Sequence, residues 1–242
     1  MTYQVATPGS ADWAKAQDMV SRVPHWHHKF EIVPGLVTPG SYDPQFMLDK
    51  LQLPADMTGV RALDIGPSDG FFSMHMARRG AHVTAIDYRA KDAHGFGAME
   101  ALSGLTFEYM QMNLYDIDPS SLGEFDVVLF LGVLYHLPDM MRALDLISRL
   151  CRTRLFVETQ YEPDLTPGVA VARYYEARTL AGDITNFWAP NRECLQAMLR
   201  DAGFRVDRED DWGARLLVDA SVDVQQEQKK VRMAYGLMPK RG

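Results

Sequence analysis

Short apolar runs alternate along this chain with segments whose apolar positions recur every three or four residues. Residues 60–65, 81–86 and 125–131 are runs of the first kind, and residues 71–79 and 139–151 follow the second pattern. Apolar runs of this length that end in turn residues predict buried strands, and a period of three to four predicts amphipathic helices. Strands that alternate with helices indicate an α/β fold with a largely parallel sheet covered on both faces.

Seven strands are expected in all, at residues 60–65, 81–86, 105–110, 125–131, 154–159, 204–206 and 214–218. The fourth is almost continuously apolar, which is typical of a central strand buried on both faces. The last two are expected to pair as an edge hairpin. The pattern therefore predicts a Rossmann-like, doubly wound, seven-stranded and mostly parallel sheet.

Two late helices have clear predicted boundaries. One follows Asn191, a good helix cap, and stops at Gly203. The other begins near Asp139 and carries a stripe of apolar residues at spacings of three and four, namely Met140, Leu144, Ile147 and Cys151.

Less regular segments flank and interrupt this pattern. We expect an N-terminal cap at residues 1–55, a ligand-binding sheet domain at 56–220 and a helical C-terminal extension at 221–242. Residues 160–190 contain prolines and glycines without a clear period, and they are long for a plain connection. They are a candidate lid or ligand-binding insertion.

The loop after the first strand carries the most informative motif. Asp64, Gly66 and Gly70 form the pattern Asp-x-Gly-x-x-x-Gly between a strand and a helix, where backbone approaches a ligand closely. A dinucleotide loop has the spacing G-x-G-x-x-G, and Ser68 stands where its middle glycine belongs. A pyrophosphate is therefore a poor fit, whereas an acid at the strand end suits a zwitterion with a free ammonium group. S-adenosylmethionine has such a group.

The second strand also ends in an acid. Asp87 lies 21 positions after Gly66, close to the spacing of about 20 at which Rossmann-type folds hold ribose hydroxyls. The alternative is that Asp87 only caps the following segment. Because the upstream loop is already a candidate cofactor site, ribose binding is the favoured interpretation.

Composition narrows the classes of protein. The 242 residues are 47% hydrophobic and 24% charged, which describes one ordinary globular domain with a small appendage. The longest apolar run, residues 127–134, is far shorter than the roughly 20 residues of a membrane helix. A cytoplasmic location is expected, because the chain has no secretory signal pattern and its two cysteines form no disulfide framework. The net charge of −7 argues against a broad nucleic-acid surface.

Besides the loop and Asp87, the sequence contains four further short motifs: Gly132-Val133-Leu134-Tyr135-His136, Phe187-Trp188-Ala189-Pro190, Trp26-His27-His28 and Thr38-Pro39-Gly40. With them, residues 60–220 resemble a class I S-adenosylmethionine-dependent methyltransferase. More narrowly, the chain resembles the branch that includes tRNA wobble-uridine carboxymethyltransferases and many relatives acting on small molecules.

The resemblance implies contacts with each part of the cofactor. Around its methionine end it implies Asp64, Gly66 and Gly70, and beside its methionine portion Phe130 and Leu131. For the ribose it implies Asp87, and for adenine Asn113 and Leu114. Asn113 departs from the family's usual aspartate, although its amide oxygen can still accept a hydrogen bond from adenine.

Methyl transfer to an alcohol needs a base within hydrogen-bond reach, because an alcohol is a weak nucleophile until its proton leaves. His136, just past the fourth strand, is the first candidate, since a histidine pKa near 6.5 suits proton transfer at neutral pH. The alternative is a structural histidine. Tyr135 is expected to orient the acceptor or to pack under the lid. Glu158 is expected to orient His136, to accept the hydroxyl proton or only to cap its strand.

Two sets of residues are candidates for a metal. His136, Glu158 and Glu162 would hold a divalent ion such as Mg²⁺, but the acid-rich cluster of metal-dependent sugar O-methyltransferases is not evident. The histidines at positions 25, 27 and 28 lack the second group of ligands that a closed site requires. An acceptor-binding cap and a surface wrap without function are the two interpretations of that segment.

Three functions from different classes follow. The first is an O-methyltransferase for a small hydroxylated acceptor, such as a sugar or a biosynthetic intermediate, with no nucleic-acid or membrane partner. The second is a tRNA wobble-uridine (carboxy)methyltransferase, which would need a basic face and for which Lys29 is a weak candidate to hold a carboxylated cofactor. The third is a non-catalytic cofactor-binding module, against which the intact loop argues. A homodimer through the apolar residues Val231, Tyr235 and Leu237 is a further option.

Overall fold

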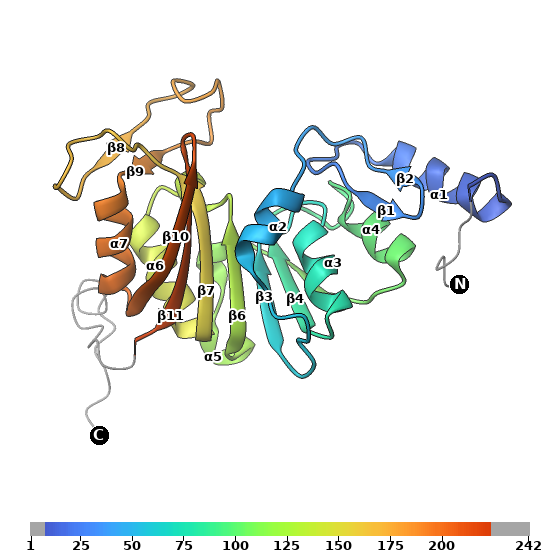
Figure 1. The fold of residues 1–242 in the computed structure, drawn as a ribbon, viewed down its shortest axis with the longest axis horizontal. Helices are drawn as coiled ribbons and strands as arrows, with labels where there is room; N and C mark the ends of the chain where they lie inside the picture. Colours follow the sequence, from blue (N-terminus) through green and yellow to red (C-terminus); the bar gives the residue numbers. More distant parts are fainter. Residues whose placement is uncertain (1–7, 224–242) are drawn as a thin grey trace. The chain divides into compact units, whose positions relative to one another are not determined.

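A computed structural model describes residues 8–223 of the chain (Figure 1). The expected C-terminal extension, with Val231, Tyr235 and Leu237, lies outside the described residues except for positions 221–223. The chain divides into two compact units, Met1–Leu114 and Tyr115–Gly242. We describe each unit by itself.

The first unit holds three parallel strands in the order β3-β4-β5. Its elements are α1 (Ala11–Arg22), β1 (Glu31–Val33), β2 (Leu36–Val37), α2 (Gln45–Leu51), β3 (Arg61–Ile65), α3 (Phe71–Arg78), β4 (His82–Asp87), α4 (Phe96–Ser103) and β5 (Glu108–Gln111). Because the three strands are parallel, the residues that follow them lie at one edge of the sheet. The N-terminal elements α1 and β1 pack against α4 (Figure 1).

The second unit holds four strands in the order β10-β11-β7-β6. Its elements are α5 (Pro119–Leu122), β6 (Phe125–Leu131), the 3₁₀ turn η2 (Leu134–His136), α6 (Met140–Leu150), β7 (Cys151–Gln160), β8 (Ala172–Tyr174), β9 (Trp188–Pro190), α7 (Arg192–Asp201), β10 (Phe204–Trp212) and β11 (Arg215–Val222). Strands β6 and β7 are parallel, β11 is antiparallel to β7, and β10 and β11 form the expected hairpin.

The predicted α/β fold with seven strands, mostly parallel, is confirmed. The predicted cap at Asn191 is present, since its side chain accepts a hydrogen bond from the N–H of Cys194 at 2.9 Å. Asp139, where the other helix was expected to begin, also acts as a cap and accepts from the N–H of Arg142 at 3.0 Å. These contacts satisfy backbone donors that a helix leaves without an internal partner.

Predicted boundaries are wrong at four places. The last two strands are longer than expected, because β10 runs to Trp212 and β11 to Val222 instead of ending at 206 and 218. Cys151 does not continue the apolar stripe of α6, because its backbone is already extended (φ −94°, ψ 120°) and it opens β7. The strand expected at 105–110 begins only at Glu108, since residues 104–107 connect it to α4. The pattern also missed two short hairpins, β1-β2 in the N-terminal segment and β8-β9 within residues 160–190.

Candidate functional site

The loop between β3 and α3 turns through three residues in the left-handed region. They are Gly66 (φ 75°), Ser68 (φ 55°) and Gly70 (φ 82°). Glycine adopts this conformation at no steric cost, whereas Ser68 must be held in it by its surroundings. The N–H of Gly66 donates to the carbonyl of Ile86 at 2.8 Å, so the loop is tied to the end of β4.

Gly70 is required by packing as well as by backbone conformation. A Cβ atom at this position would lie 2.2 Å from Cε of Met99 and 2.9 Å from Cδ2 of Phe96. Both of those residues belong to α4. The second glycine of the motif therefore lets the start of α3 approach α4.

Asp64 is a buried carboxylate near the end of β3. It is 2% exposed, and Oγ of Ser73 donates to its Oδ2 at 2.6 Å. Burial raises its pKa to about 6, because the hydroxyl of Ser73 and the charge of His28 offset only part of the desolvation of the ionised form. A cationic group of a ligand beside Asp64 would stabilise that form.

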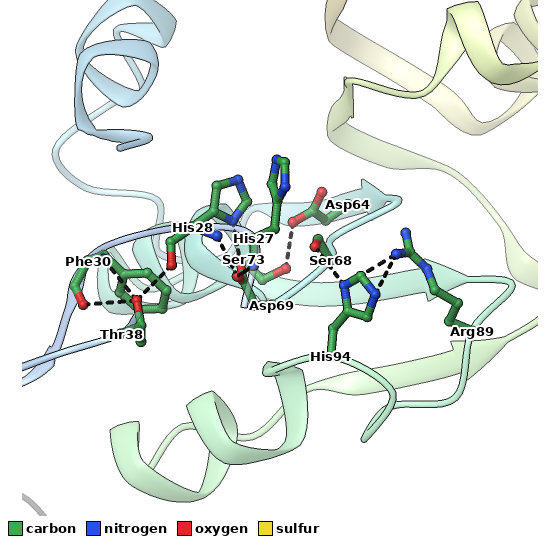
Figure 2. A network of polar contacts seen from close by, with 10 residues as sticks. All are labelled: His27, His28, Phe30, Thr38, Asp64, Ser68, Asp69, Ser73, Arg89 and His94. Carbon is green, nitrogen blue, oxygen red and sulfur yellow. Dashed lines mark hydrogen bonds and ion pairs between the residues drawn. The ribbon is translucent and has the colours of Figure 1, made fainter. Parts of the chain in front are cut away.

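Asp87, at the end of β4, is also buried, and one of its two oxygens is engaged. Oδ1 accepts hydrogen bonds from the backbone N–H of Arg89 at 2.9 Å and from its Nε at 3.1 Å. Among the described residues none donates to Oδ2. Arg89 also contacts the ring of His94, which in turn meets Oγ of Ser68 at 3.2 Å (Figure 2). This chain of contacts links Asp87 to the loop.

Asn113 and Leu114 follow β5 at the same edge of the sheet. The backbone there is fixed to β4, since the N–H of Met112 donates to the carbonyl of Asp87 at 2.9 Å. Asn113 is exposed and Leu114 is buried. The predicted residues of the first unit thus gather at the carboxyl ends of its three strands.

The sequence did not single out Asp69, which is the most enclosed carboxylate of the loop. It is completely buried and accepts hydrogen bonds from the N–H groups of His27 and His28, at 2.9 and 2.7 Å, and from Nδ1 of His28 (Figure 2). Burial raises the pKa of Asp69, but the contacts with His28 outweigh it and hold the pKa below its usual value.

These contacts explain why two short motifs of the N-terminal segment occur together. Oγ1 of Thr38 donates to the carbonyl of His28 at 2.7 Å and accepts from the N–H of Phe30 at 3.0 Å. A Cβ atom on Gly40 would lie 2.2 Å from the carbonyl carbon of His28. Thr38 and Gly40 therefore fix the backbone of His28 where it meets Asp69. The histidine segment thus docks on the loop, and its role in binding an acceptor stays a prediction.

In the second unit, the tip of β6 leads directly to the predicted catalytic residues. Phe130 is completely buried and Leu131 is half-buried, so Leu131 is the better placed of the two to touch a ligand. The chain then turns at Gly132 (φ 71°), whose N–H donates to the carbonyl of Glu158 at 2.9 Å. Tyr135 and His136 follow in η2.

Both carboxylate oxygens of Glu158 are engaged by Arg215 of β11. Nη2 of Arg215 lies 2.6 Å from Oε2, and its Nε contacts Oε1. Burial lowers the pKa of Arg215, but the ion pair with Glu158 outweighs this effect and raises it. The guanidinium also lies over the ring of Tyr135, 4.6 Å from its centroid. Arg215 therefore links Glu158 to Tyr135.

His136 contacts the segment that was predicted to be a lid. Its Nδ1 lies 3.1 Å from the carbonyl oxygen and 3.0 Å from Oγ1 of Thr185. Oγ1 donates its own proton to Oδ1 of Asp183 at 2.7 Å. A carbonyl oxygen can only accept, so Nδ1 carries the proton and the lone pair of the neutral ring is on Nε2.

Residues 160–190 are anchored to η2 and to the residues after it. The N–H of Phe187 donates to the carbonyl of Tyr135 at 2.9 Å, and Nε1 of Trp188 donates to the carbonyl of Pro138 at 3.1 Å. Glu162, the third predicted metal ligand, contacts the hydroxyl of Tyr175. The described part of the chain contains no group of three or more histidine, cysteine, aspartate or glutamate residues that could hold a metal ion.

Within residues 8–223, no helix is long and apolar enough to cross a membrane.

Several curated proteins resemble this chain in sequence. A ubiquinone biosynthesis O-methyltransferase of Aeromonas salmonicida is 39% identical over 104 residues, which cover 42% of this chain and 43% of the relative. The corresponding enzyme of Xylella fastidiosa strain M23 is 29% identical over 193 residues, which cover 73% of this chain and 76% of the relative. The matched stretch thus spans less than half of the first relative.

Solved structures share the fold. The N-terminal domain of EvdMO1, crystallised in the presence of SAH and D-fucose, matches with a TM-score of 0.67 and 21% identity over 90% of this chain and 99% of that domain. Magnesium protoporphyrin IX methyltransferase of Synechocystis PCC 6803, with bound SAM, matches with a TM-score of 0.52 and 17% identity over 88% of this chain and 81% of that enzyme. A sequence profile described as a methyltransferase domain matches residues 40–209. Since this match covers more than half of the chain, the protein belongs to the methyltransferase-domain family.

Proposed function

We propose that the protein transfers a methyl group from S-adenosylmethionine to a hydroxyl group of a small polar acceptor. The observation that carries the choice of a hydroxyl is the contact of His136 with Thr185, which leaves the lone pair of the neutral imidazole on Nε2. A lone pair at this position suits the removal of a proton from an alcohol.

The residues of the first unit fit the cofactor. The carboxylate of Asp64 is buried and accepts a hydrogen bond from Ser73, and it suits the ammonium group of the methionine end. Oδ2 of Asp87 suits a ribose hydroxyl, and Asn113 and Leu114 are the candidates for adenine. Gly66 and Gly70 shape the loop, and two of the structural relatives were solved with SAH or SAM. S-adenosylmethionine supplies a methyl group that is already activated by its sulfonium.

The residues of the second unit have separate proposed roles. His136 removes the proton of the acceptor hydroxyl through Nε2. Tyr135 orients the acceptor. The ring of Tyr135 is held by the guanidinium of Arg215, which is itself paired with Glu158. Glu158 is thus a positioning residue, because Arg215 occupies both of its oxygens. Leu131 is the proposed contact for the methionine portion, with Phe130 as buried support.

A sugar or a biosynthetic intermediate is the proposed class of acceptor. The relatives include enzymes named for O-methylation in ubiquinone biosynthesis and a domain crystallised with D-fucose. Residues 1–55 serve as a cap on the cofactor loop and residues 160–190 as a lid, since Thr185 contacts His136. The tRNA alternative has no support among the relatives described above, and the net charge of −7 opposes it.

A screen of hydroxylated metabolites, sugars first, tests this function with S-adenosylmethionine labelled in its methyl group. The wild type is expected to yield a labelled methyl ether. His136→Ala is expected to lower kcat by about 10²–10⁴-fold, the usual contribution of a general base, with little change in SAH affinity. Methylation of nitrogen or carbon, or full activity of His136→Ala, would contradict the assignment. A chelator added to the same reaction tests the metal alternative. An unchanged rate in its presence would exclude a catalytic role for a divalent ion.

A further inference from the structure

The buried pair Asp69–His28 joins two segments that are 41 positions apart in the sequence. Asp69 is 0% exposed and His28 is 6% exposed, so neither side chain is available to touch a ligand. Asp69 nevertheless lies inside the cofactor loop. Any effect of this pair on binding must therefore pass through the shape of that loop.

The loop has a conformation that needs external support. Asp69 is flanked by Ser68 and Gly70, both in the left-handed region, with φ angles of 55° and 82°. A glycine-containing loop has many open conformations, and a ligand that selects one of them loses affinity in proportion to the ordering required. Three hydrogen bonds to the carboxylate of Asp69 remove much of that freedom before the ligand arrives.

The partner of Asp69 is itself rigidly held. Thr38 and Gly40 fix the backbone of His28, and its ring packs against those of Phe71 and Phe72, with centroids 5.9 and 5.7 Å apart. Phe71 and Phe72 begin α3, immediately after the loop. His28 therefore contacts the cofactor loop and the helix that follows it.

We propose that the Asp69–His28 pair is a positioning device that holds the cofactor loop in its binding conformation and so sets the affinity for S-adenosylmethionine. This inference rests on the proposed function, because it takes the loop to be the cofactor site. It assigns to the N-terminal histidine segment a role in cofactor binding.

Two substitutions of His28 separate its hydrogen bond from its packing. The amide nitrogen of asparagine occupies nearly the place of Nδ1, so His28→Asn keeps the donor to Asp69 and loses most of the ring. His28→Leu keeps much of the volume and loses the donor. Calorimetric titration of the full-length protein with SAH is expected to show an affinity at least about tenfold weaker for His28→Leu, and within about threefold of the wild type for His28→Asn.

Leu51→Ala is the matched control, because Leu51 is 0% exposed in α2 and is not one of the hydrogen-bond partners of Asp69. It is expected to lower the thermal stability and to leave the SAH affinity unchanged. The inference is overturned if His28→Leu binds SAH as the wild type does, if His28→Asn is as weak as His28→Leu, or if Leu51→Ala weakens binding equally. Should His28→Leu fail to fold, Asp69→Asn replaces it, with a loss of about three- to tenfold expected and wild-type affinity overturning the inference. A wild type that binds no SAH would instead refute the proposed function itself.

Discussion

Two buried carboxylates of the first unit have opposite pKa shifts because their donors differ. Asp64 receives a hydrogen bond from one hydroxyl, and its pKa rises to about 6. Asp69 receives hydrogen bonds from two backbone N–H groups and one imidazole, and its pKa falls. Burial alone therefore does not decide the protonation of either group.

The shift of Asp64 predicts a pH-dependent stability. Its pKa is raised from 3.8 to about 6 in the folded protein, so its stabilising contribution is complete below pH 3.8 and is lost as the pH rises through 6. Asp64→Asn is expected to be more stable than the wild type at pH 8, by on the order of 3 kcal/mol, and this difference should be largely lost near pH 4. Urea unfolding of the ligand-free protein at both pH values measures this. A wild type that is the more stable of the two at pH 8 would contradict it.

Asp69→Asn is expected to show the opposite sign. The pKa of Asp69 is lowered in the folded protein, so its contribution is present above the unfolded value and is lost as the pH falls. The variant should be less stable than the wild type at pH 8 and should approach it in acid. The same urea series supplies the measurement, and a stabilised variant at pH 8 would refute the account of its donors.

Asp87 is expected to control cofactor affinity. Asp87→Ala removes the carboxylate whose Oδ2 is assigned to the ribose, and it should weaken SAH binding more than tenfold. Arg89→Gln is the control, since it removes the guanidinium from Oδ1 and leaves Oδ2 in place. Equal affinity of Asp87→Ala and the wild type in calorimetry would remove the ribose assignment.

At the scale of elements, the glycines of the turns have different reasons to be glycine. Gly59 and Gly70 have similar φ angles, 78° and 82°, but only Gly70 would place a Cβ atom against α4. Gly59→Ala is expected to destabilise the protein by about 1 kcal/mol, the cost of the left-handed backbone. Gly70→Ala is expected to cost about 2 kcal/mol more through overpacking. Equal unfolding midpoints for the two variants would show that α4 shifts to make room for the added methyl group without a cost in stability.

The two helix caps of the second unit also differ in the contacts that their side chains make. Asp139 caps α6, whereas Asn191 caps α7 and also bonds to the insertion, accepting from Val171 and donating to the carbonyls of Leu165 and Val169. Asp139→Ala should cost about 1 kcal/mol, as ordinary caps do, and Asn191→Ala about 3 kcal/mol. Urea unfolding gives both values, and limited proteolysis within 160–190 should accelerate only for Asn191→Ala. Equal costs would mean that Asn191 is only a cap.

Local pattern was enough to predict most of these elements and not their exact limits. The caps at Asp139 and Asn191 were predictable because each depends on residues within three positions. The start of β7 at Cys151 was not, because a helix and a strand meet there without a glycine or proline to mark the boundary. The hairpins β1-β2 and β8-β9 are too short to leave a period in the sequence.

At the scale of the whole molecule, the family and the fold class follow from the order of strands and the cofactor motif. The partners within the site did not follow, because they lie far apart in the sequence. His28 and Asp69 are 41 positions apart, Glu158 and Arg215 are 57 apart, and His136 and Thr185 are 49 apart. Asp69, Arg215 and Thr185 were missed for this reason, although Asp69 stands within the motif that identified the loop.

The central claim is that the loop between β3 and α3 binds S-adenosylmethionine and no dinucleotide. Calorimetric titration of the full-length protein with SAH and, separately, with NAD tests it most directly. We predict saturable binding of SAH at one site per chain and no binding of NAD, because the loop has Ser68 in place of the middle glycine that a pyrophosphate requires. Binding of NAD without binding of SAH would contradict the account.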